Sequence, residues 1–264
     1  MTAQGEEHAS TMGTPGGVRP ARGATTAGDD TSVTRGAMRP IAALTTFKIA
    51  AYLRSHRVIQ PFVGLLAIMI ILYSVRVAAG QELSSYADSA ALLVPVFAWA
   101  ARGLLDTEPD VQRLISATAA GRPGREVASG LAAVVTVNSG LAAFALVVPL
   151  VIGFTTTPGG TVLVAGLALH LLSLLTGTAI GALTSRPILP DPAVSVLAML
   201  GGYAAILLVS LAPITWLTVP VISWIRAANQ PYFLSRSLPE LSAITVVWCA
   251  LALTAYIRLR RVRP

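Results

Sequence analysis

Long apolar runs separated by short polar segments make up most of the chain after residue 57. A helix needs about 20 predominantly apolar residues to cross a hydrocarbon core about 30 Å thick. Open strands are excluded, because lipid cannot satisfy the backbone groups at their edges. The pattern therefore predicts an all-α integral membrane protein with a six-transmembrane-helix bundle. The predicted spans are Val58–Ala79, Ser84–Leu105, Val127–Phe154, Thr161–Leu183, Pro192–Ala212 and Pro239–Ile257.

The apolar run that contains the fifth span is too long for one helix. No acidic or basic residue occurs from Pro192 to Ile225, and Pro213 and Pro220 interrupt this stretch. Proline breaks the helical hydrogen-bond ladder. We therefore expect the span to end near Ala212 and a shallow or re-entrant element to follow at Ile214–Trp224. A capping box at Ser237–Glu240 is expected to open the sixth span.

The chain before the first span has two parts. Residues 1–39 are rich in small and polar residues and lack apolar periodicity, which predicts a disordered cytoplasmic tail. The six-span domain then covers 40–264. Between Ile41 and Arg57, apolar residues recur at helical spacing and basic residues gather at the end. This predicts an amphipathic helix on the membrane surface that faces lipid phosphates. A soluble extension of the first span fits the pattern equally well.

Composition and charge agree with a membrane protein. Charged residues make up 12% of the chain and the mean hydropathy is +0.70, whereas soluble proteins contain about 25% charged residues. The net charge is +7, but the basic residues lie between apolar runs rather than in one stripe, which excludes a nucleic-acid-binding domain. With a cytoplasmic N-terminus, only Arg76, Arg226 and Arg236 fall outside. The positive-inside rule therefore predicts a multi-pass plasma-membrane protein with both termini cytoplasmic.

The longest predicted cytoplasmic loop carries a helix signal. Thr107 is a good N-cap, and Glu108 and Asp110 suit a first helical turn, where the helix dipole favours carboxylates. An apolar face follows, and Gly121 stops the helix. Such a helix is either a structural part of the loop or a docking helix whose apolar side chains fill a groove on a partner protein.

The order of these elements resembles a known family. A basic surface helix, two spans, a charged cytoplasmic helix at Glu108–Arg113 and four further spans with an extra outer element are similar to the membrane (permease) subunits of type-2 ABC exporters. These are bacterial drug, antibiotic and polysaccharide exporters, and the resemblance covers residues 40–264. It implies that the loop helix is the coupling helix, which docks on the ATPase. Its residues would be Glu108, Asp110, Val111, Arg113, Leu114 and Ile115.

The same resemblance implies the partners. A separate ABC ATPase subunit would bind and hydrolyse ATP, and a second permease copy would complete the pathway as a homodimer or with a similar subunit. The chain itself is then no enzyme and carries no cofactor. Consistent with this, the glycine cluster at Gly121–Gly124 lacks the Gly-Lys-Ser/Thr of a phosphate-binding loop. The apolar spans suggest an amphipathic, natural-product-like or drug-like cargo, whose identity the sequence does not reveal.

A few polar residues fall inside the spans. His170 lies near the middle of the fourth span, where an ionisable residue is a functional candidate, although a neutral histidine bonded to a neighbouring helix explains it as well. Asp88 lies near the outer end of the second span. Neither forms a set of acids or metal ligands, so a membrane-embedded enzyme is the weaker alternative, together with a scaffold protein. Gly177 and Gly181 form a GxxxG motif, consistent with close helix packing.

Overall fold

A computed structural model describes the backbone of residues 30–109, 112, 115, 118, 123–212, 214–230 and 232–262. The described chain contains six helices that are long and apolar enough to cross a membrane. The prediction of an all-helical, multi-pass membrane protein is therefore confirmed. The six helices are α2 (Ile59–Tyr73), α3 (Glu82–Leu105), α5 (Pro123–Val148), α6 (Gly160–Leu183), α7 (Pro192–Ser210) and α9 (Leu238–Val262).

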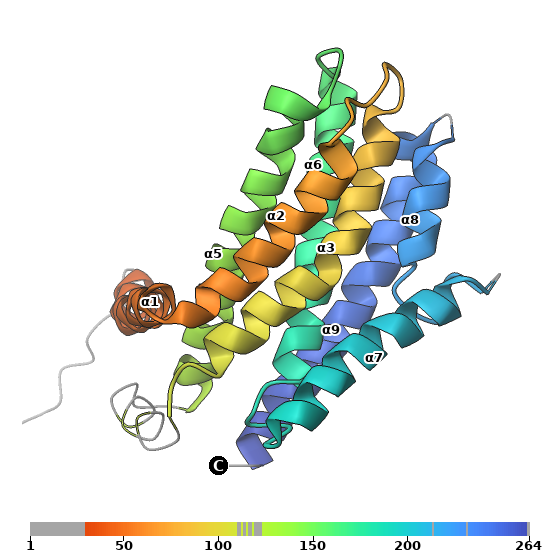
Figure 1. Ribbon diagram of the computed structural model, residues 1–264. Helices are drawn as coiled ribbons and strands as arrows, with labels where there is room; N and C mark the ends of the chain where they lie inside the picture. Colours follow the sequence, from red (N-terminus) through yellow and green to blue (C-terminus); the bar gives the residue numbers. More distant parts are fainter. Residues whose placement is uncertain are drawn as a thin grey trace, which may run out of the picture.

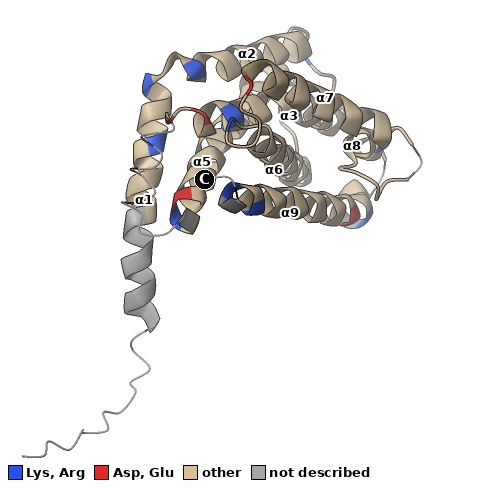
Figure 2. Ribbon diagram, turned by 90° about the horizontal axis from the view of Figure 1, so that it is seen from below, with Lys and Arg blue, Asp and Glu red and all other residues tan. Residues whose placement is uncertain are grey.

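The six long helices form one bundle (Figure 1). The N-terminal helix α1 (Asp30–Arg54) lies across one end of this bundle and is seen end-on in Figure 1. We call this the α1 end; it also holds the C-terminal part of α9. The opposite end holds the short helix α8 (Val221–Ala228), and we call it the α8 end. Figure 2 shows that the lysine, arginine and acidic residues of the long helices of the bundle gather near the helix ends, whereas α1 also carries a basic residue within its length.

Helix α1 begins earlier than the sequence indicates. It includes the last residues of the stretch assigned to a disordered tail, because its first residue is Asp30. Residues 1–29, the rest of that predicted tail, lie outside the described residues. The helix ends at Arg54, and a 3-10 turn at His56–Val58 leads directly into α2. The surface helix and the first span are therefore separated by a sharp turn, and one does not continue straight into the other (Figure 1).

Helices α3 and α6 pack most closely, and small residues allow this contact. A Cβ atom added to Gly177 would lie 2.5 Å from Cβ of Phe97 and 2.7 Å from the carbonyl oxygen of Val94. One added to Gly181 would collide with the carbonyl oxygen of Ala98. The predicted role of the GxxxG motif is confirmed, because the backbones approach too closely for any side chain.

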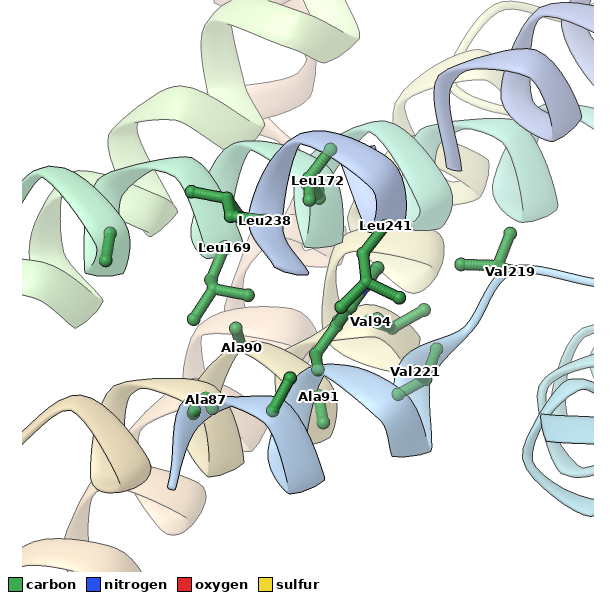
Figure 3. Packing of buried hydrophobic residues seen from close by; sticks show 14 of the residues in the cluster. Ala87, Ala90, Ala91, Val94, Leu169, Leu172, Val219, Val221, Leu238 and Leu241 are labelled. Atoms are coloured by element: carbon green, nitrogen blue, oxygen red, sulfur yellow. The ribbon is translucent and has the colours of Figure 1, made fainter. Parts of the chain in front are cut away.

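A buried apolar cluster surrounds this contact and joins α3 and α6 to α8 and α9 (Figure 3). Its largest member is Trp224 of α8, whose side chain has no exposed surface. Trp224 thus fixes α8 against the long helices. The residues labelled in Figure 3 are Ala87, Ala90, Ala91, Val94, Leu169, Leu172, Val219, Val221, Leu238 and Leu241.

The first predicted span ends too late. Helix α2 stops at Tyr73 rather than near Ala79. Beyond it, the backbone N–H of Val77 donates to the carbonyl of Gly153 at 2.8 Å, and the N–H of Thr155 donates to the carbonyl of Val77 at 3.2 Å. This short bridge ties the end of α2 to the π-helical turn Pro149–Gly153 that follows α5. The apolar residues after Tyr73 therefore extend across the bundle end and do not lengthen the helix.

The predicted outer element also lies later than expected. Residues 214–220 are not helical, and α8 occupies Val221–Ala228 rather than Ile214–Trp224. A π-helical turn at Phe233–Ser237 then runs into α9. Ser237 therefore belongs to a helical turn and does not cap the last span, so the predicted capping box is wrong. Pro220 immediately precedes α8, and proline suits a helix start better than its interior, so α8 begins after Pro220 rather than spanning it.

Candidate functional site

Four charged side chains meet inside the α1 end, and we call them the ionic cluster. Lys48 of α1 places its Nζ 2.7 Å from Oε2 of Glu108 and 3.2 Å from Oε1 of Glu126. The other oxygen of Glu126 accepts a hydrogen bond from Nη2 of Arg260 at 2.8 Å. The exposed fraction of each side chain is between 6% and 10%. The cluster therefore links α1, the segment after α3, the start of α5 and the end of α9.

Local helix properties place these groups. Glu126 lies in the first turn of α5 and Arg260 near the C-terminus of α9. Each charge therefore has the sign that its own helix dipole favours. Helix α1 turns Lys48 and Tyr52, one turn apart, towards the bundle, whereas Phe47 and Leu53 are exposed. Phe47 and Leu53 thus lie on the outer face of α1, and Lys48 and Tyr52 lie on its inner face.

Tyr52 closes the inner face of α1 next to the cluster. Its side chain has no exposed surface, and its ring lies 3.4 Å from the position that a Cβ atom on Gly103 would take. Burial raises the pKa of Tyr52 above its usual range, only partly opposed by the positive charge of Arg57. The phenol therefore stays neutral at physiological pH, and its ring lies against α3 at Gly103.

A second group of polar contacts surrounds Asp106, just after α3. Its Oδ1 accepts from the backbone N–H of Arg186 at 2.7 Å, and its Oδ2 lies 3.7 Å from Nε of Arg102. Its carbonyl accepts from Nη1 of Arg57 at 2.7 Å. Burial raises the pKa of the Asp106 carboxyl, while the Arg186 N–H and the nearby arginines oppose this rise. Asp106 thereby joins the end of α3 to the start of α2 and to the α6–α7 connection.

Arg102 extends these contacts to α7. Its Nε donates to Oγ of Ser195 at 2.5 Å, and its Nη2 donates to the carbonyl of Pro192 at 3.3 Å. Ser195 in turn donates to the carbonyl of Thr184, just after α6. From its place near the end of a predicted span, we expect the Arg102 side chain to reach the membrane surface. In the structure its guanidinium instead holds the first turn of α7 against α3.

The six predicted docking residues have different outcomes. Glu108, predicted to take part in docking, is buried and bonded to Lys48. This contact was not predicted, because the N-cap pattern is local, whereas Lys48 lies 60 residues away in sequence. Ile115 is helical and 63% exposed. The remaining predicted residues, Asp110, Val111, Arg113 and Leu114, lie outside the described residues.

The predicted intramembrane residues do not form a joint site. His170 is fully buried, with Nδ1 2.8 Å from the carbonyl of Gly166 and Nε2 3.2 Å from Oγ of Ser89 on α3. Since a carbonyl only accepts, Nδ1 carries the proton, and a neutral ring leaves Nε2 as an acceptor for the Ser89 hydroxyl, which also lies 3.0 Å from the carbonyl of Tyr86. This is the geometry of a neutral histidine bonded to a neighbouring helix. Asp88 is half-buried on α3 and takes no part in the described contacts of His170.

Sequence analysis did not predict the ionic cluster, although the sequence contains two indications of it. Lys48 is the only lysine of the chain, and it is the only charged residue between Arg39 and Arg54. Glu126 is an acid at the very start of a long apolar run. Their pairing could not be inferred, because nothing in local spacing indicates that α1 crosses the bundle beside the start of α5.

The chemistry of the cluster is that of a structural connection. It contains two cations and two carboxylates in direct contact, and such groups fix the relative position of the elements that carry them. Within the described ranges, no three His, Cys, Asp or Glu side chains are arranged to hold a metal ion. Fold and cluster together define a multi-pass helical membrane protein whose N-terminal helix is joined to the bundle by buried ion pairs. No family model, curated protein or solved structure matches this chain.

Proposed function

We propose that this chain is the permease subunit of an ATP-driven exporter of the type-2 ABC class. It would move an amphipathic substrate across the plasma membrane, with ATP bound and hydrolysed by a separate subunit. In this proposal the α1 end faces the cytoplasm, where most of the lysine and arginine residues lie. The ATPase would dock on the segment between α3 and α5, which leaves the bundle at this end.

The ionic cluster carries the proposal. A docking segment can drive a transporter only if its displacement is passed to the spans. Glu108 lies at the start of this segment and contacts Lys48, which contacts Glu126 of α5, which in turn contacts Arg260 of α9. A force on the segment would therefore reach α1, α5 and α9 through direct contacts between buried charges. A loop that only connects two spans has no need of this buried connection.

The exposed face of α1 supports the same orientation. Phe47 and Leu53 are 47% and 57% exposed, and the basic residues Arg54 and Arg57 follow them. An apolar stripe bordered by basic groups suits a helix in the membrane interface, with the apolar side chains among the acyl chains. Helix α1 would then lie in the plane of the cytoplasmic leaflet, in keeping with its course across the bundle axis (Figure 2).

A second permease copy is part of the proposal. Helix α7 has the smallest buried share of the six spans at 17%, and the span that contains α2 reaches only 22%. Both present large exposed apolar side chains, including Ile70 and Ile71 on α2 and Leu197 and Leu208 on α7. The second copy would cover one of these faces and complete the pathway, whereas lipid would cover the rest.

The test targets Ile115, the exposed apolar residue of the docking segment. The tagged chain is purified from membranes of its native cells, and a Walker-motif subunit and ATP hydrolysis are measured in the preparation. We expect Ile115→Asp to remove both, because it places an unpaired charge in a desolvated contact. Ile115→Met, which keeps the apolar surface, should retain both.

Insertion of each variant into the membrane serves as the control, since residue 115 lies outside the six long helices. An inserted wild-type chain that purifies without any ATPase subunit would contradict the proposed function. Normal recruitment of the ATPase by Ile115→Asp would show that the docking surface lies elsewhere.

A further inference from the structure

A polar cavity opens at the α8 end, far from the ionic cluster. Its volume is about 560 Å³, and it lies between α8, the π-helical turn Phe233–Ser237 and the first turn of α9. Its polar lining comes from Thr215, Ser223, Arg226, Gln230, Arg236 and Glu240. Two guanidinium groups thus face one carboxylate across a space large enough for a lipid headgroup.

The two arginines are available for a ligand. Both side chains are exposed, and within the described part of the chain neither forms an ion pair or a side-chain hydrogen bond. They are also two of the few basic residues at this end, where arginine is otherwise scarce. The planar guanidinium forms paired hydrogen bonds with phosphate oxygens. An excess of positive charge in the cavity therefore favours an anion of this shape.

The rim of the cavity has an unusual backbone. Tyr232, which also lines the cavity, has φ of 65° and ψ of 23°, in the left-handed region. Among the described residues it is the only one other than glycine with a positive φ. Such conformations are uncommon for residues with a bulky side chain and concentrate at binding sites. The conformation leaves the aromatic ring 79% exposed at the mouth of the cavity.

An apolar flank adjoins the polar cavity. Nε1 of Trp248 on α9 donates to the carbonyl of Trp216 at 3.0 Å, which holds the segment before α8 against α9. Trp216 is 68% exposed, and Leu217 beside it is 44% exposed. Trp248 lies near the middle of the span Leu238–Arg260, so this flank lies at the depth of the acyl chains. Glu240 precedes Trp248 by two helical turns, about 12 Å along α9, so the cavity lies on the aqueous side of this tryptophan pair.

We propose that this cavity binds the phosphodiester headgroup of an anionic membrane lipid. Arg226 and Arg236 would contact the phosphate, and the acyl chains would lie along the flank formed by Trp216 and Leu217. The polar cavity next to an exposed apolar surface matches an amphiphile better than a free anion, which would have no use for the flank. The inference goes beyond the proposed export function and does not depend on an ATPase.

The test measures lipid retention by the purified full-length chain. Phosphatidylglycerol, phosphatidylcholine and free glycerol phosphate are titrated separately, and binding is followed by native mass spectrometry. We expect phosphatidylglycerol to bind roughly tenfold more tightly than phosphatidylcholine. Arg226→Gln and Arg236→Gln should each weaken phosphatidylglycerol binding by roughly tenfold, and Glu240→Gln should strengthen it, because a repelling carboxylate is removed.

Arg76→Gln is the matched control. Arg76 is an exposed arginine between α2 and α3 at the same end, and it does not line the cavity. Its replacement should leave binding unchanged. If Arg76→Gln and Arg226→Gln weaken phosphatidylglycerol binding equally, general surface charge explains the binding and the proposal is overturned. Unchanged binding by the Arg226→Gln/Arg236→Gln double variant would also overturn it. Glycerol phosphate binding as tight as that of phosphatidylglycerol would refute the role of the lipid chains.

Discussion

Replacement of Lys48 by methionine is the sharpest test of the ionic cluster. Methionine keeps much of the length of lysine and removes its charge. Lys48 contacts two carboxylates, but Glu126 keeps the Arg260 guanidinium 2.8 Å away. The substitution therefore mainly affects Glu108, whose side chain is 6% exposed and loses the ammonium group 2.7 Å from it.

The expected magnitude follows from this burial. The value for exposed ion pairs, about 0–1 kcal/mol, does not apply to side chains this deeply buried. Removal of one partner of a buried pair costs about 3–5 kcal/mol, because a charge stays behind without its counter-ion. In a chain of this size, each kcal/mol lowers Tm by about 2–4 °C. Lys48→Met should therefore lower Tm by roughly 6–20 °C.

Thermal unfolding of the purified protein in lipid nanodiscs measures the effect. Arg54→Met is the matched control, since Arg54 is an exposed basic residue of the same helix. It should change the free energy of unfolding by less than about 0.5 kcal/mol. The double variant Lys48→Met/Glu108→Gln should be at least about 1 kcal/mol more stable than the sum of the single effects predicts. Additive effects, or equal Tm values for Lys48→Met and Arg54→Met, would refute a buried ionic connection.

Two further predictions concern other parts of the α1 end and the core. Gly177→Ala should destabilise the protein by about 1–3 kcal/mol in the same unfolding assay, because its Cβ has no space beside Phe97. Gly201→Ala, in α7 with nothing within 4 Å of the added Cβ, should be neutral or stabilising by up to about 1 kcal/mol. Burial raises the pKa of Asp106 above its ordinary value of 3.8, so the folded state binds the proton more readily. The free energy of unfolding therefore falls as pH rises from 3.8 through the raised pKa. Tm of the wild-type chain should fall over this pH range, and Tm of Asp106→Asn should not fall with it.

The membrane-spanning helices could be predicted because they depend on local properties. Hydropathy and length suffice to place a span, and the sequence located the starts of α6 and α7 to within one residue. The close packing at the glycine pair of α6 could also be predicted, because GxxxG allows two helix backbones to approach closely. The end of α2 could not be predicted from the sequence. It depends on backbone hydrogen bonds between Val77 and a segment that follows α5, and a long-range contact of this kind leaves no local pattern.

The candidate site was harder to predict for a related reason. Glu108 fits the first turn of a predicted loop helix, and that local fit suggested an exposed position. Its actual environment is set by α1, which crosses the bundle and brings Lys48 to it. Positive-inside reasoning likewise counts a lysine or arginine by its side of the membrane and not by its partners. It therefore treated Lys48 and Arg260 as equivalent to exposed arginines such as Arg54, although their surroundings differ completely.

The packing of the bundle indicates which parts would move together in the proposed transport cycle. Helices α3 and α6 touch through backbone atoms at Gly177 and Gly181, so they cannot slide past each other without a collision. Asp106 also joins the end of α3 to Arg186 just beyond α6. A displacement of the segment after α3 would therefore move α3 and α6 as one body. The spans of α7, α2 and α9 are covered least by the rest of the chain, so lipid or a second copy can follow the movement of these outer helices. Coupling through the ionic cluster would thus displace a rigid central pair relative to loosely held outer helices.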